Sequence, residues 1–89
     1  MGKQTGIIKI YNPTKSQILV KYFIFNKNIE GYFIGYNENE IIIDESNYIN
    51  NKVEGIKKHY YANQQLAEIC NYKNGKRKGE PKYIPFEIV

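Results

Sequence analysis

The chain carries one pattern twice in succession: YFIGYNENEIIIDESNYINNKVEG at residues 32–55 and IKKHYYANQQLAEICNYKNGKRKG at residues 56–79. Aligned without a gap, at an offset of 24 residues, the two stretches are identical at seven positions. Residues 8–31 fit the same period, and residues 80–89 begin a fourth unit and stop. A fixed period of this length is typical of repeat architectures. We therefore predict a single domain, residues 1–89, built from three 24-residue units and a closing strand.

Each unit has the pattern of a β-hairpin, because two runs of alternating apolar residues flank a turn. In the third unit the turn is Asn74-Gly75, and Asn-Gly between strands is a strong hairpin signal, since both central residues must take a positive φ. The equivalent pairs are Asn50-Asn51 and Asn26-Lys27, where Asn still tolerates that conformation. Glycines that recur early in strands indicate a bulge or a close approach of another backbone. These glycines are Gly31, Gly55 and Gly79.

The composition favours strands throughout the chain. Ile occurs 15 times and Tyr nine times, and both favour strands, whereas the helix-favouring residues Ala and Leu occur twice each. We predict an all-β fold, a twisted antiparallel meander of about seven strands joined by short hairpin loops. The expected strands are residues 6–11, 17–25, 29–36, 41–49, 53–61, 65–73 and 82–89.

Length and composition also limit the kinds of function. The chain is 42% hydrophobic and 25% charged, which is ordinary globular usage, but 89 residues bury only a small core, so we do not expect a large cleft between layers. No window approaches the roughly 18 apolar residues of a transmembrane helix, and no secretory signal is visible. Cys70 is the single cysteine, which rules out an internal disulfide and a zinc site with several thiolates. We therefore expect a cytoplasmic protein, and the many Ile, Asn and Lys residues, whose codons are AT-rich, indicate a low-GC bacterium or one of its mobile elements.

Successive side chains of a strand point to opposite faces, so we assign even-numbered residues to one face and odd-numbered residues to the other. The even face is apolar and aromatic along the chain, whereas the odd face is polar in the third unit, at Lys57 and His59. On this assignment the single histidine, His59, and Cys70 lie on opposite faces, which argues against a Cys–His dyad. Asp44 and Glu68 occupy equivalent repeat positions, where we expect them to accept hydrogen bonds from tyrosine hydroxyls or backbone amides. We predict that the chain is not an enzyme and has no catalytic residue, no metal site and no cofactor.

Residues 55–80, GIKKHYYANQQLAEICNYKNGKRKGE, resemble a bacterial MORN-type repeat. The shared elements are a glycine, a paired aromatic, a turn asparagine, Leu-x-Glu and Tyr-x-Asn-Gly-Lys. The second unit departs from this pattern, because Asn37 replaces one aromatic of the pair and Asn51 replaces the turn glycine. This variant of the repeat is known from antitoxin components encoded beside toxin genes. The resemblance implies hairpins stacked side by side into an elongated, curved sheet.

The excess of apolar residues is the most informative feature for function. A single-layer meander has no helix to cover either face, so exposed aromatic side chains must either fold into a small core or contact a partner. Both interpretations stay open for the first unit. The first strand and the phenylalanine patch also allow an isologous homodimer. The candidate protein-binding residues are Leu19, Phe23, Phe25, Phe33 and Tyr61 as anchors, with Lys76, Arg77 and Lys78 as rim charges.

These features predict a non-catalytic protein-binding inhibitor, and the MORN-type resemblance implies the antitoxin or immunity type, which blocks a partner protein by steric occlusion. The partner would be a toxin or a defence effector. A phage-encoded inhibitor of a bacterial defence system (an anti-CRISPR or other anti-defence protein in the host-cell cytoplasm) fits the same features. The basic hairpin 73–78 supports an alternative of another class, a module that binds nucleic acid or anionic lipid. The net charge of +4 is modest for that class.

Overall fold

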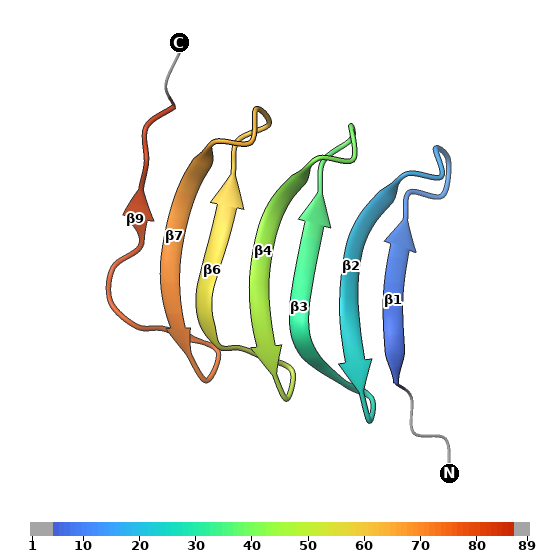
Figure 1. Ribbon diagram of the computed structural model, residues 1–89, viewed down its shortest axis with the longest axis horizontal. Helices are drawn as coiled ribbons and strands as arrows, with labels where there is room; N and C mark the ends of the chain where they lie inside the picture. Colours follow the sequence, from blue (N-terminus) through green and yellow to red (C-terminus); the bar gives the residue numbers. More distant parts are fainter. Residues whose placement is uncertain (1–4, 87–89) are drawn as a thin grey trace.

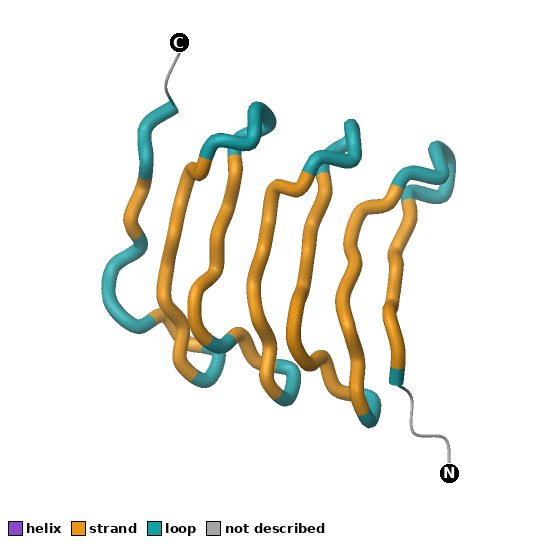
Figure 2. Tube along the Cα trace, viewed as in Figure 1, coloured by secondary structure: helices purple, strands orange, loops and turns teal. Residues whose placement is uncertain are grey.

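A computed structural model describes residues 5–86 as one antiparallel β-sheet (Figures 1 and 2). Seven of its nine strands follow the order β1-β2-β3-β4-β6-β7-β8, while β5 pairs with β4 and β9 with β7. The strands are β1 (Gly6–Tyr11), β2 (Ile18–Phe25), β3 (Asn28–Tyr36), β4 (Ile42–Ile49), β5 (Lys52–Val53), β6 (Gly55–Tyr60), β7 (Leu66–Lys73), β8 (Lys76–Arg77) and β9 (Lys82–Tyr83). The prediction of an all-β antiparallel meander is confirmed.

The predicted strand bounds agree with the first four strands and with β7 to within one residue. The predicted strand 53–61 is instead divided at Glu54 into β5 and β6, and Gly55, the first residue of β6, has a φ of +86°. The short strand β8 was not predicted. Within the predicted strand 82–89 the structure assigns Lys82–Tyr83, and residues 87–89 lie outside the described residues.

The predicted hairpin turns have the backbone conformation that the sequence requires. Both residues of each turn have a positive φ, namely Asn26 and Lys27 (51° and 70°), Asn50 and Asn51 (49° and 69°), and Asn74 and Gly75 (53° and 82°). The three repeat glycines also have a positive φ, of 82° to 86°. A Cβ built at Gly31, Gly55 or Gly79 meets no atom within 4 Å, so backbone conformation, and not close approach, explains these glycines.

Neighbouring hairpins are joined by hydrogen bonds that recur after 24 residues. The backbone amide of Asn50 donates to Oε2 of Glu30 at 2.8 Å, and that of Asn74 donates to Oε1 of Glu54 at 3.0 Å. At the third turn, the Gly75 amide also donates to the carbonyl of Val53 at 2.9 Å. Each of these turns is therefore bonded to the hairpin before it, which places the hairpins side by side (Figure 1).

The sheet is a single layer. The principal extents of the molecule are 53 × 37 × 15 Å. Among the described residues, only Ala67 (8% exposed) and Cys70 (5% exposed) are buried hydrophobic residues. Stability must therefore come from the strand ladder and from cross-strand side-chain pairs more than from an enclosed core. No helix within residues 5–86 is long and apolar enough to span a membrane.

The prediction of one even-numbered and one odd-numbered face is wrong. A two-residue turn pairs residues that differ by three, such as Phe25 with Asn28, so an odd-numbered residue faces an even-numbered partner. The same holds further along, as for Lys21 with Ile34. Cross-strand partners point to the same face, so the parity of a face alternates from strand to strand after β2. The true faces mix the two predicted sets.

Candidate functional site

One face of the sheet, here called the histidine face, gathers ionisable residues of the second and third units. Strand pairing places Asp44 opposite His59 and His59 opposite Glu68, in one row across β4, β6 and β7. Lys57 and Cys70 form the next row. By pairing and alternation, the histidine face comprises Ile8, Ile10, Val20, Tyr22, Phe33, Gly35, Asp44, Ser46, Tyr48, Lys57, His59, Glu68, Cys70, Tyr72 and Arg77.

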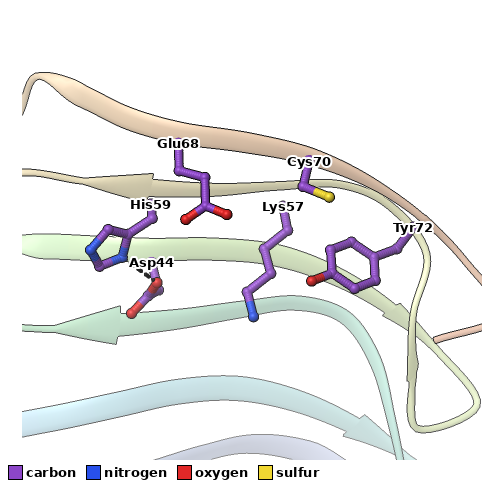
Figure 3. Close-up of a pocket in the computed structure, with 6 residues that line it drawn as sticks. All are labelled: Asp44, Lys57, His59, Glu68, Cys70 and Tyr72. Atoms are coloured by element: carbon purple, nitrogen blue, oxygen red, sulfur yellow. Dashed lines mark hydrogen bonds and ion pairs between the residues drawn. The ribbon is translucent and has the colours of Figure 1, made fainter. Parts of the chain in front are cut away.

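A groove of about 220 Å³ lies on this face, and Figure 3 shows the side chains that line it. Asp44 reaches the groove over Gly35, its partner on β3, where a Cβ would lie 3.3 Å from both the Cβ and Oδ2 of Asp44. The absence of a side chain at Gly35 therefore makes room for this carboxylate. The lining residues are Asp44, Lys57, His59, Glu68, Cys70 and Tyr72.

Asp44 and His59 form the closest ionisable pair of the groove, with Oδ1 of Asp44 2.7 Å from Nδ1 of His59. A carboxylate at this nitrogen fixes the orientation of the imidazole ring, as in acid–base sites. However, the His59 side chain is 47% exposed and that of Asp44 is 39% exposed, so water reaches both groups. A pair this exposed contributes at most about 1 kcal/mol to stability.

Cys70 lines the same groove as His59, which corrects the prediction that the two lie on opposite faces. The thiol is nevertheless placed as a packed side chain, because Cys70 is only 5% exposed and its Sγ lies 3.6 Å from the carbonyl oxygen of Asn71. In Figure 3 Cys70 lies towards the end of the groove away from His59. Within residues 5–86, no three His, Cys, Asp or Glu side chains are grouped to hold a metal ion.

Aromatic contacts occupy the rest of the histidine face. The ring of Phe33 stacks on Tyr22 with centroids 5.2 Å apart and is tilted against Tyr48, also at 5.2 Å. Further along, Nζ of Lys57 lies 5.9 Å from the ring centroid of Tyr72. Side chains from successive strands therefore contact one another along this face.

The opposite face, here called the lysine face, combines lysines with exposed apolar residues. One row across the sheet consists of Lys9, Lys21, Ile34, Glu45, Lys58, Ile69 and Lys82. The neighbouring rows contribute Ile7, Phe23, Tyr32, Asn47, Ile56 and Asn71. Ile7 is 57% exposed, Ile56 49% and Tyr32 37%.

The single carboxylate in the lysine row is already bonded. The hydroxyl of Tyr60 donates to Oε1 of Glu45 at 2.6 Å. This hydrogen bond, together with burial and the negative charge of Glu45, raises the pKa of Tyr60 from 10.0 to about 12. Tyr60 therefore keeps its hydroxyl proton to a higher pH than an ordinary tyrosine.

The structure does not gather the predicted anchor residues into one patch. Phe23 pairs with Ile7 on the lysine face, whereas Phe33 stacks on Tyr22 on the histidine face, so the two phenylalanines lie on opposite sides of the sheet. Leu19 lines a cavity together with Phe33. Phe25, at the end of β2, is 51% exposed.

Tyr61 and the rim charges have separate places. The hydroxyl of Tyr61 donates to the carbonyl of Ile84 at 2.8 Å, and its ring contacts Phe86 edge-on, so this side chain holds the C-terminal segment. Lys76, Arg77 and Lys78, the predicted rim charges, are exposed beside the Asn74-Gly75 turn. Sequence reasoning missed the grouping of Asp44, His59 and Glu68 and the lysine row, because both depend on strand registers that the turns alone do not fix.

The chain matches no protein-family model, no curated protein and no solved structure.

Proposed function

We propose that this chain is a non-catalytic protein-binding inhibitor, of the antitoxin or immunity type, that acts by covering a surface of a partner protein. The observation that carries this proposal is the single-layer sheet, in which only Ala67 and Cys70 are buried hydrophobic residues of the described chain. Apolar side chains that their own chain does not cover are typical of surfaces that meet another molecule.

The dimensions of the sheet suit steric occlusion. A standard protein–protein interface buries about 800 Å² on each partner. A sheet with principal extents of 53 by 37 Å offers a larger area than this on either face. Because neighbouring hairpins are bonded through Glu30 and Glu54, the surface is built before a partner arrives, which lowers the ordering cost of binding.

The geometry of the histidine face supports the non-catalytic part of the proposal. An acid–base site usually combines a positioned base with a nucleophile or substrate in a water-excluding cavity. Here the Asp44–His59 pair is exposed to water, and Cys70 is packed against the backbone of Asn71.

The basic hairpin favours a second candidate, a module that binds nucleic acid or anionic lipid. Lys73, Lys76, Arg77 and Lys78 are exposed around the Asn74-Gly75 turn. A Cβ at Gly75 would contact the side chain of Lys52 at 3.6 Å, so a further lysine from the preceding hairpin lies beside this turn.

An inhibitor of a bacterial defence system would share the proposed mechanism and differ only in its target.

Affinity capture from the lysate of a low-GC bacterium tests the proposed function. The full chain is immobilised, and eluates are compared at about 0.15 M and about 1 M salt, where charges are screened within roughly 8 Å and 3 Å. We expect one protein to be retained at both salt concentrations. A matched bait with Lys76→Glu, Arg77→Glu and Lys78→Glu should retain it too, since the rim is not the anchor. Nucleic acid retained only at low salt, and only by the unaltered bait, would refute the inhibitor in favour of the second candidate.

A further inference from the structure

We propose that the lysine face docks an acidic protein surface with an apolar centre. This inference rests on the proposed function and specifies which face binds and what chemistry the partner offers. Four lysines lie in one row across the sheet, at Lys9, Lys21, Lys58 and Lys82. In that row Glu45 is the single carboxylate, and Tyr60 already donates a hydrogen bond to it. With four lysines against one carboxylate, the row presents an excess of positive charge to a partner.

Apolar side chains follow this charged row on the same face. Ile7 and Ile56 are 57% and 49% exposed, which leaves about half of each side chain to be covered. A groove of about 320 Å³ lies between the lysine row and these apolar residues, near the middle of the sheet. Its lining includes Tyr32, Ile34, Glu45, Ile56 and Lys58. An apolar side chain of a partner fits such a groove, with carboxylates beside it to meet the lysines.

The positive charge continues towards the basic hairpin. Lys52 pairs with Ile49, and Lys76 pairs with Lys73, at the turn ends of the same face, where Glu54 lies 3.8 Å from Lys73 and balances it in part. On the histidine face, Lys57 and Arg77 are matched in number by Asp44 and Glu68. Charge complementarity therefore selects the lysine face for an acidic partner, and it accounts for a chain with a net charge of +4.

Two features favour a protein over a membrane or a nucleic acid. Asn47 lies opposite Tyr32, and Asn71 lies opposite Ile56, so covering the apolar residues also covers exposed side-chain amides. A protein partner can hydrogen-bond these amides, whereas lipid hydrocarbon cannot. Single-stranded nucleic acid binds by stacking bases on free aromatic rings. The ring of Tyr32 is instead overlaid by Lys21, whose Nζ lies 5.8 Å from its centroid.

Isoleucine-methyl NMR of the full chain provides the test. The probe is a synthetic peptide of glutamate and leucine spaced to form an amphipathic helix, and its lysine–leucine counterpart is the charge control. Phosphatidylcholine vesicles with and without phosphatidylserine, and oligo(dT), are compared in parallel. We expect the acidic peptide to shift the methyl signals of Ile34 and Ile56, while those of Ile8 and Ile10 stay in place.

Two neighbouring lysines of β6 give a matched pair of variants, because Lys58 lies on the lysine face and Lys57 on the histidine face. The double change Lys21→Glu and Lys58→Glu should weaken peptide binding about tenfold or more, whereas Lys57→Glu should change it less than about twofold. The methyl spectrum of each free variant reports whether it is folded. A partner recovered from lysate should give the same ranking.

The inference fails if the peptide does not bind, if it shifts Ile8 and Ile10 instead, or if Lys57→Glu weakens binding as much as the double change. It also fails if phosphatidylserine vesicles or oligo(dT) bind and the acidic peptide does not. The proposed function fails separately, when no protein is retained from lysate at high salt. A retained protein that is insensitive to Lys21→Glu and Lys58→Glu would therefore refute the lysine face while leaving the inhibitor in place.

Discussion

The two faces of the sheet differ in what their side chains contact. On the histidine face they contact one another, as when Phe33 stacks on Tyr22 at 5.2 Å. On the lysine face Ile7 and Ile56 are about half exposed, and the single carboxylate of the row, Glu45, is bonded to a tyrosine. A sheet of one layer has almost no enclosed core, so these surface contacts take over its role. We infer from this difference that the aromatic contacts of the histidine face support the sheet, while the lysine face is the one proposed for recognition.

The largest difference between the faces should appear in stability. Phe33 and Tyr32 are neighbours in β3 that point to opposite faces. We expect Phe33→Ala to lower the free energy of unfolding by about 2–3 kcal/mol, because it removes two aromatic contacts, and Tyr32→Ala by about 1 kcal/mol. Urea denaturation followed by circular dichroism measures both, with sucrose added to every sample if Phe33→Ala is unfolded in buffer. Equal losses would show that the histidine face has no special structural role.

The assignment of residues to faces depends on the backbone at the repeat glycines, which gives the next largest effect. Gly55 has a φ of +86° and open space where a Cβ would lie. We expect Gly55→Ala to lower the free energy of unfolding by about 1–2 kcal/mol, from backbone strain alone. A synthetic chain with D-alanine at this position adopts the same φ without strain and should match the unaltered chain. Thermal unfolding compares the two, and a D-alanine chain as unstable as the L-alanine chain would contradict this account.

The fold was predictable because its determinants are local. Asn74-Gly75 and its equivalents require a positive φ, and alternating apolar residues between such turns leave few alternatives to hairpins. Even the missing glycine at Asn51 has a local explanation. Its side chain accepts a hydrogen bond from the amide of Ile29 at 2.7 Å and donates to Asn28 at 2.9 Å, which binds the turn to β3.

The faces were not predicted because they depend on pairing between strands. The incorrect assignment separated His59 from Cys70 and scattered the lysines. Two-residue turns reverse the parity of the next strand, and register shifts within the ladder then bring Lys21, Glu45 and Lys58 into one row, which the turns alone do not predict. The exposed fraction of each side chain and the hydrogen bond from Tyr60 to Glu45 depend on three-dimensional contacts, which no sequence pattern contained.

A smaller effect is expected at the Asp44–His59 pair, although it is the shortest ion-pair contact of the histidine face. Both side chains are more than a third exposed, so Asp44→Asn should lower the free energy of unfolding by less than about 1 kcal/mol. Binding of the acidic peptide on the other face should not change. Urea denaturation and the methyl titration check the two expectations. A loss above about 2 kcal/mol would mean that this pair, and not the aromatic stack, is the main support of the face.

The smallest effect concerns one proton on the lysine face. Glu45 raises the pKa of Tyr60 from 10.0 to about 12, chiefly by accepting its hydrogen bond. The folded chain therefore keeps this proton at a pH where the unfolded chain has begun to release it. The contribution of this pKa shift to the free energy of unfolding is complete below about pH 10, and it is lost as the pH rises towards about 12.

Absorbance titration of tyrosinate in the folded protein measures this shift. One of the nine tyrosines should titrate near pH 12, and the Tyr60→Phe variant should lack that step. In Glu45→Gln the negative charge is gone, so the pKa of Tyr60 should fall towards its ordinary value. An unchanged late step in Glu45→Gln would mean that burial, and not the carboxylate, retains the proton. The hydrogen bond to Glu45 would then have no part in setting the alkaline limit of this contribution to stability.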